Sequence, residues 1–185
     1  MRFLVALLSV VTSAPVFAAD SIAYVALDFG QADAEDRCYN VPTRISCKKT
    51  STASRIAGGF QLTPTWGAEF SSANYNKTSI GVPGRNLDWE ASGMQLSGTG
   101  TFPMDNLVSI FGKLGVARTK LKLSVSCCGE NMATSTKLAF GFGVRYELSR
   151  RIAMRAQYDN LGKIGDNSTG MSRISLLSAG AVFKF

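Results

Sequence analysis

The sequence predicts an all-β fold, an eight-stranded antiparallel up-and-down β-barrel that spans a membrane. Two observations support this fold: most segments alternate between large apolar and small or charged residues, and the connections between them alternate between short and long. A third observation excludes a helical membrane protein. After residues 3–11, no apolar run approaches the ~18–20 residues that a membrane-spanning helix needs.

Residues 1–18 have the pattern of a secretory signal peptide. Arg2 is followed by a short apolar run and then by small residues at Val16 and Ala18, which predicts cleavage after Ala18. An N-terminal anchor helix is the alternative. We therefore expect residues 19–185 to form the exported barrel, in a compartment that permits disulfides.

The clearest strand pattern lies in Thr136–Leu148. One face carries Leu, Phe, Val and Tyr side chains, and the other carries mostly Gly, Ala, Lys and Arg. A soluble β-sandwich would turn the large apolar face to its core, with no reason for glycines on the opposite face. In a membrane barrel the apolar face contacts lipid, and the narrow interior favours small residues with a few long charged ones.

The same pattern predicts all eight strands. They are Ile22–Gln31, Ser54–Leu62, Trp66–Tyr75, Asp88–Phe102, Leu107–Thr119, Thr136–Leu148, Ile152–Asp159 and Ser172–Phe185. Short turns are expected at 63–65, 103–106 and 149–151, and long loops at about 32–53, 76–87, 120–135 and 162–171. Short periplasmic turns and long extracellular loops are typical of outer-membrane barrels.

Several aromatic residues fall on outward positions near the short turns or the C-terminus, as expected for a periplasmic aromatic girdle. They are Trp66, Phe102, Tyr146, Phe183 and Phe185. The first strand must also pair with the last, because an open sheet edge would leave backbone groups without hydrogen bonds in lipid.

At this point the chain resembles the small eight-stranded outer-membrane β-barrels of the OmpA, OmpX and opacity-protein type. The most specific similarities are residues 111–119, residues 143–148 with 154–158, and the C-terminal Phe183-Lys184-Phe185. The resemblance implies location in the bacterial outer membrane and handling by periplasmic chaperones and the barrel-assembly machinery, which reads such a terminal aromatic signal. Since the sequence stops at Phe185, we expect no peptidoglycan-binding domain.

Eight charged residues are expected to face the interior in equal numbers of each sign. They are Asp28, Glu69, Lys113, Arg145, Glu147, Arg155, Asp159 and Lys184. Burying an unpaired ion is costly, so this balance predicts a network of ion pairs that fills the barrel. The alternative, which the resemblance to pore-forming relatives implies, is a switchable gate formed by Glu69, Lys113, Arg145 and Arg155.

The four cysteines are all placed in the predicted external loops. We expect a disulfide between Cys38 and Cys47, whereas Cys127 and Cys128 could form a vicinal bridge, pair with the first loop or stay free. A metal or redox site at these cysteines is a weaker alternative.

Basic residues gather in the same loops and at their roots, where lipopolysaccharide presents phosphates. The candidate contacts are Arg37, Arg44, Lys48, Lys49, Lys77, Lys120 and Lys122, with Arg55 and Arg85 nearby. A solvated rim is the alternative. Export and the absence of a basic-aromatic motif argue against nucleic acid as a partner.

The chain contains no histidine, which excludes the Ser-His and Cys-His pairs of many hydrolases. We therefore expect no enzyme activity, cofactor or metal. The expected function is that of an outer-membrane barrel that stabilises the envelope and displays loops for surface interaction, including host ligands. The alternative is a narrow pore or passive transport of small solutes or hydrophobic molecules.

Overall fold

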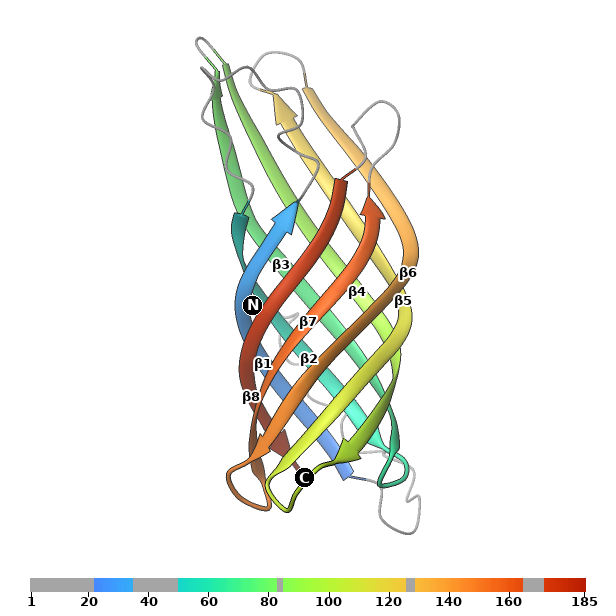
Figure 1. The fold of residues 1–185 in the computed structure, drawn as a ribbon. Coiled ribbons are helices and arrows are strands. Elements are labelled where there is room, and N and C mark those ends of the chain that lie inside the picture. Colours follow the sequence, from blue (N-terminus) through green and yellow to red (C-terminus); the bar gives the residue numbers. More distant parts are fainter. Residues whose placement is uncertain (1–21, 35–49, 83–84, 126–128, 165–171) are drawn as a thin grey trace, which may run out of the picture.

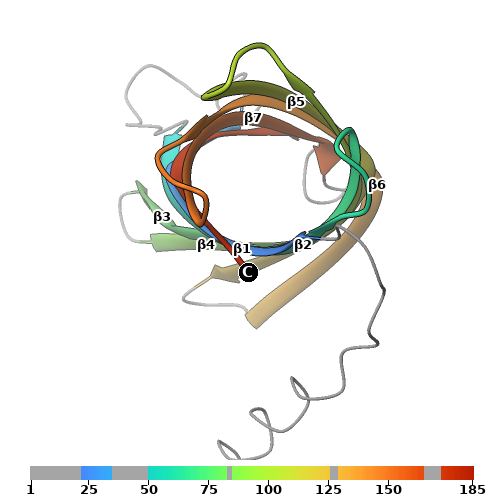
Figure 2. The same cartoon turned by 90° about the horizontal axis from the view of Figure 1, so that it is seen from below.

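The computed structural model of the protein describes residues 22–34, 50–82, 85–125, 129–164 and 172–185. These residues form eight antiparallel strands in one closed barrel, in which each strand pairs with its neighbours in sequence and β1 pairs with β8 (Figures 1 and 2). The strands are β1 (Ile22–Ala34), β2 (Thr50–Gln61), β3 (Trp66–Val82), β4 (Arg85–Pro103), β5 (Val108–Val125), β6 (Gly129–Glu147), β7 (Ile152–Ile164) and β8 (Ser172–Lys184). None of the described segments is a helix that could cross a membrane.

The predicted fold class is confirmed, and so is the closure of the first strand on the last. Tyr24 of β1 pairs with Lys184 of β8, and Leu27 pairs with Ala181. Closure gives every strand a partner on both sides at the height of the apolar band, so the barrel has no open sheet edge where it contacts lipid.

The two faces of the strands differ as the alternation predicts. On β6, Leu138 and Phe142 point outward and are 74% and 59% exposed, whereas Ala139 between them is fully buried inside the barrel. Elsewhere the outward face is also rich in Leu, Ile, Phe and Met, whereas Ala, Gly, Ser and Thr are common on the inward face. This arrangement places hydrocarbon against the large side chains and leaves the narrow interior to small ones.

Two inward-pointing rings lie directly on glycines of the neighbouring strand. A Cβ at Gly59 would lie 2.4 Å from Cζ of Tyr24, and one at Gly143 would lie 2.7 Å from Cζ of Phe111. Only a residue without a side chain leaves room for these rings. The glycines on the charged face of the strand pattern therefore have a packing function.

Tight turns close the lower end of the barrel in Figure 1, and backbone hydrogen bonds hold them. The N–H groups of Leu62 and Thr63 donate to the carbonyl of Trp66, at 2.9 and 3.0 Å. The N–H groups of Leu148 and Ser149 donate in the same way to Ile152. Short connections of this kind are expected at the periplasmic end of an outer-membrane barrel.

The predicted long loops at 76–87 and 120–135 are wrong for most of their residues. Strands β3 and β4 continue as a hairpin to Val82 and Arg85, and β5 and β6 continue to Val125 and Gly129. These four strands have 17 to 19 residues, against 12 or 13 for the others, and they rise above the barrel in Figure 1. Outside the lipid both faces of a strand can be polar, so the alternation that reveals a strand is lost there.

Candidate functional site: the barrel interior

A compact group of six buried charged side chains fills the middle of the barrel. We call it the central charge network, and its members are Asp28 on β1, Arg55 on β2, Glu69 on β3, Lys113 on β5, and Arg155 and Asp159 on β7. Three carboxylates face three cations, so the network is neutral when all six are ionised. Such balance is what a site screened from water requires.

Arg155 lies at the centre of the network and binds two carboxylates. Its Nε and Nη2 donate to the two oxygens of Asp28, at 2.8 and 2.7 Å, which is a bidentate pair. Its Nη1 donates to Oε2 of Glu69 at 2.5 Å. One guanidinium therefore joins β7 to β1 and β3 across the interior.

The other two cations, Arg55 and Lys113, connect the third carboxylate, Asp159, to the first two. Arg55 donates from Nε to Asp28 at 2.9 Å and from Nη1 to Asp159 at 2.5 Å. The Nζ of Lys113 forms ion pairs with Asp159 at 2.8 Å and with Glu69 at 3.4 Å. Each carboxylate thus contacts two cations.

Neutral polar groups complete the network. The Tyr24 hydroxyl donates to Glu69 at 3.0 Å, and Lys113 donates to the amide oxygen of Gln157 at 2.9 Å. The Gln157 amide nitrogen lies 3.4 Å from both Asp28 and Ser178. These contacts fix the orientation of the charged groups and rigidify the interior.

The structure brings together five of the eight predicted interior charges, namely Asp28, Glu69, Lys113, Arg155 and Asp159. The other three lie nearer the periplasmic end. Lys184 and Glu147 form a separate, partly exposed pair at 2.5 Å. The Arg145 guanidinium lies over the rings of Tyr24 and Phe111, with distances of 5.5 and 5.6 Å to the ring centroids.

Arg55 is the network residue that sequence reasoning missed, because it was assigned to the rim of the first loop. On β2 it lies between Ala53 and Ala57 on the inward face, opposite Ile56 and Phe60. That alternation was present in the sequence. The predicted strand Ser54–Leu62 already contained Arg55 on the same face as Ala57 and Gly59, so the alternation alone could have identified it as an inward residue.

Two apolar layers enclose the central charge network. Toward the extracellular side the buried layer includes Tyr75, Leu161, Ile174 and Leu176 among several alanines. Toward the periplasm Tyr24 and Val182 pack with Ala26, Ala57 and Ala153. A cavity of only about 10 Å³ lies beside Arg55 and Asp159 under Tyr75. Side chains therefore fill the middle of the interior, as expected for eight strands.

The predicted girdle residues all lie on the outer surface near the short turns or at the C-terminus. Their exposed fractions are 62% for Trp66, 54% for Phe102, 46% for Tyr146, 39% for Phe183 and 81% for Phe185. Aromatic rings at this height are typical of membrane–water interfaces.

The predicted cysteine and lipopolysaccharide sites fall mostly where the structure gives no description. Cys38, Cys47, Cys127, Cys128, Arg37, Arg44, Lys48 and Lys49 lie outside the described residues. Lys77 lies on β3, Lys120 is exposed on β5, and Lys122 is half-buried on the same strand. Within the described ranges, no group of three or more Cys, Asp or Glu side chains could hold a metal ion.

Comparison with known sequences assigns the family. The model of the OmpA-like transmembrane domain matches residues 18–185. Outer membrane protein A of Escherichia coli O157:H7 is 27% identical over 130 residues, which cover 69% of this chain and 38% of that protein. The Shigella flexneri protein of the same name is 25% identical over 98% of this chain and 53% of its own length. The chain thus spans about a third to a half of these relatives.

Solved structures agree on the fold. Neisserial surface protein A has a TM-score of 0.66 at 20% identity, covering 88% of this chain and 97% of that one. Ail of Yersinia pestis, solved with the heparin analogue sucrose octasulfate, has a TM-score of 0.65 at 15% identity, covering 90% and 100%. OprG of Pseudomonas aeruginosa has a TM-score of 0.65 at 15% identity, covering 89% and 96%. With its closed eight-stranded barrel and apolar outer face, this chain belongs to the family of OmpA-like transmembrane domains and is an outer-membrane protein.

Proposed function

We propose that this protein is a non-enzymatic structural barrel of the outer membrane whose extracellular extension takes part in surface interactions. The observation that carries the structural role is the filled interior. The central charge network and the two apolar layers lock strands on opposite sides of the barrel together. A rigid, closed cylinder suits a protein that stabilises the envelope.

Planar-bilayer recordings of the purified barrel test the structural role. We expect only rare and small conductance, because a filled interior gives ions no continuous path. A steady conductance in most insertions of the wild-type protein would contradict the proposal. The same sample should resist trypsin, and its gel migration should change on heating. Both results would show that the inserted protein is folded.

The long hairpins support the surface role. Beyond the apolar band, Arg118 and Lys120 are exposed on the outward face of β5, above Val116 and Leu138. This is the height at which lipopolysaccharide phosphates lie, and Lys and Arg bind phosphate and sulfate through charge-assisted hydrogen bonds. The structural neighbour Ail was solved with a sulfated saccharide analogue. We propose that β5 contributes to binding of such anionic groups.

Binding of heparin to proteoliposomes tests the surface role. The double variant Arg118→Gln/Lys120→Gln should lower retention several-fold. The matched control, Arg150→Gln/Arg151→Gln, removes the same charge from the exposed periplasmic turn and should bind as the wild type does in right-side-out vesicles. Equal loss in both variants would indicate a nonspecific effect of net charge.

A gated pore is the alternative, and the position of Glu69 favours it. Its carboxylate contacts Arg155 at 2.5 Å and Lys113 at 3.4 Å, so two cations compete for one anion. A shift of Glu69 from Arg155 to Lys113 would open a route beside Arg155. The variants Glu69→Ala and Arg155→Ala should then raise the frequency of open events, whereas recordings identical to those of the wild type would exclude a gate.

A further inference from the structure

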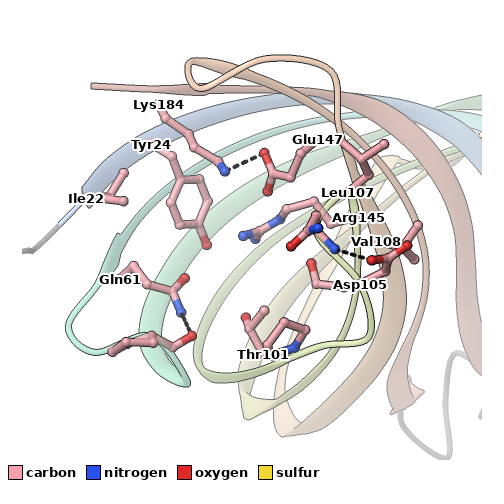
Figure 3. Close-up of a pocket in the computed structure, with 14 residues that line it drawn as sticks. Ile22, Tyr24, Gln61, Thr101, Asp105, Leu107, Val108, Arg145, Glu147 and Lys184 are labelled. Atoms are coloured by element: carbon pink, nitrogen blue, oxygen red, sulfur yellow. Dashed lines mark hydrogen bonds and ion pairs between the residues drawn. The ribbon is translucent and has the colours of Figure 1, made fainter.

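A pocket of about 310 Å³ lies inside the periplasmic mouth of the barrel, below the Tyr24 layer. Side chains from the first and last strands line it together with the turn between β4 and β5 (Figure 3). Its wall combines polar groups, such as Gln61 and Ser109, with apolar ones, such as Ile22, Leu107 and Val108. No role was predicted for this space from the sequence.

Arg145 reaches into this pocket toward Tyr24, and no carboxylate of the described part of the chain pairs with it (Figure 3). The residue is only 8% exposed, and its Nε is buried without a hydrogen bond. Within the described ranges, its contacts are the two rings of Tyr24 and Phe111. The Thr101 hydroxyl, which lines the same pocket, is also buried without a hydrogen-bond partner. Buried cations normally contact a carboxylate or another acceptor, so this site lacks an expected component.

The other charges of the pocket are already engaged. Lys184 pairs with Glu147 at 2.5 Å, and that pair lies near the opening. The Oδ1 of Asp105 accepts the backbone N–H of Asn106 at 2.7 Å, and the residue is exposed on its turn. Among the described residues that line the pocket, the free positive charge is therefore that of Arg145.

We propose that this pocket binds a small carboxylate that enters from the periplasm. The carboxylate would accept hydrogen bonds from the Arg145 guanidinium, whose planar donors match two oxygens. The apolar body of the ligand would pack against Ile22 and Leu107. The pocket volume suits a short organic acid, since a water molecule occupies about 30 Å³ of liquid. Anions with a wholly polar body, such as inorganic phosphate, would pair with the guanidinium but would leave the apolar wall without a partner.

Nuclear magnetic resonance titration of the folded barrel in detergent micelles tests this site with two probes of equal shape. Butyrate should shift the Arg145 Nε–Hε signal in a saturable way, and butyramide, which lacks the charge, should bind at least about tenfold more weakly. Inorganic phosphate should bind more weakly than butyrate. Equal shifts with butyrate and butyramide would overturn the proposal, and tighter binding of phosphate would overturn the assignment of an apolar ligand body.

Two variants locate the binding. Arg145→Gln should weaken butyrate binding at least about tenfold, read from the Thr101 and Ser109 amide signals. Arg151→Gln, which removes an exposed arginine from the neighbouring turn, should bind as the wild type does. Unchanged affinity in Arg145→Gln would contradict the proposal. Heat-modifiable migration shows whether this variant folds, and if it does not, the comparison of butyrate with butyramide on the wild-type protein decides.

Discussion

Arg155 on β7 holds the carboxylate of Asp28 on β1 in a bidentate pair, although β8 lies between the two strands. The pair therefore adds a link that the sheet hydrogen bonds do not provide. Apart from Arg55 and Asp28, the ion pairs of the central charge network likewise join strands that are not neighbours. The interior thus ties the barrel wall together across its width.

Replacing Arg155 with Gln should destabilise the barrel by about 3–5 kcal/mol, because two buried carboxylates lose their main cation. Urea unfolding in lipid vesicles, followed by tryptophan fluorescence, measures this change. Arg151→Gln on the exposed turn is the control and should change stability by less than about 0.5 kcal/mol. Similar stabilities of the two variants would show that the network contributes little.

Alanine at Gly143 should destabilise the protein by about 1–3 kcal/mol, because its Cβ would collide with the Phe111 ring and the Ala156 carbonyl. Gly112→Ala is the matched control on β5. This glycine faces outward, and a Cβ there would have no atom within 4 Å. The free energy of unfolding of the Gly112→Ala variant should stay within about 1 kcal/mol of that of the wild type. The same unfolding measurement compares both, and equal losses would contradict the proposed ring packing.

Arginine at Leu114 should destabilise the inserted barrel by about 2–4 kcal/mol, since this outward residue is 67% exposed in the middle of the apolar band. Met104 is similarly exposed but lies on a periplasmic turn, so Met104→Arg should cost about 1 kcal/mol or less. Refolding yield in vesicles and urea midpoints report the difference. If both positions tolerate arginine equally, hydrocarbon does not surround Leu114.

Thiol counting should show that Cys38 and Cys47 form a disulfide in the exported protein. These residues lie outside the described ranges, so the bond remains a prediction from the sequence. Maleimide labelling under denaturing, non-reducing conditions should find one additional reactive thiol in Cys38→Ser. Full labelling of the wild-type protein would exclude the disulfide, and an added thiol in Cys127→Ser would show that Cys127 is bonded as well, to Cys128 or to the first loop.

The membrane-embedded part of the fold was predictable because lipid imposes a strict rule on it. Every outward residue there contacts hydrocarbon, so Phe140 and Phe142 must alternate with Gly141 and Gly143. The starts and ends of most strands at the periplasmic side follow from the same rule. Above the membrane the rule no longer applies, and the continuation of β3 past Tyr75 could not be predicted from alternation.

The central charge network was predictable in composition but not in its contacts. Equal numbers of acidic and basic inward residues indicated pairing, yet the sequence does not show which residues share a height. The register places Asp28 opposite Arg55 and Arg145 opposite Arg155, yet the Arg145 side chain lies over the Tyr24 and Phe111 rings, outside the network. Strand tilt and stagger decide these heights, and neither can be derived from the pattern along one strand.

The cross-barrel pairs also discriminate against wrong closure during assembly. If β1 met β8 one residue out of step, Asp28 would turn into hydrocarbon. A shift of two residues would keep it inside but move its carboxylate away from Arg155 by about two strand rises, or ~7 Å. In both misaligned barrels some charged side chains would lack a partner. The buried charges therefore favour the correct pairing of β1 with β8.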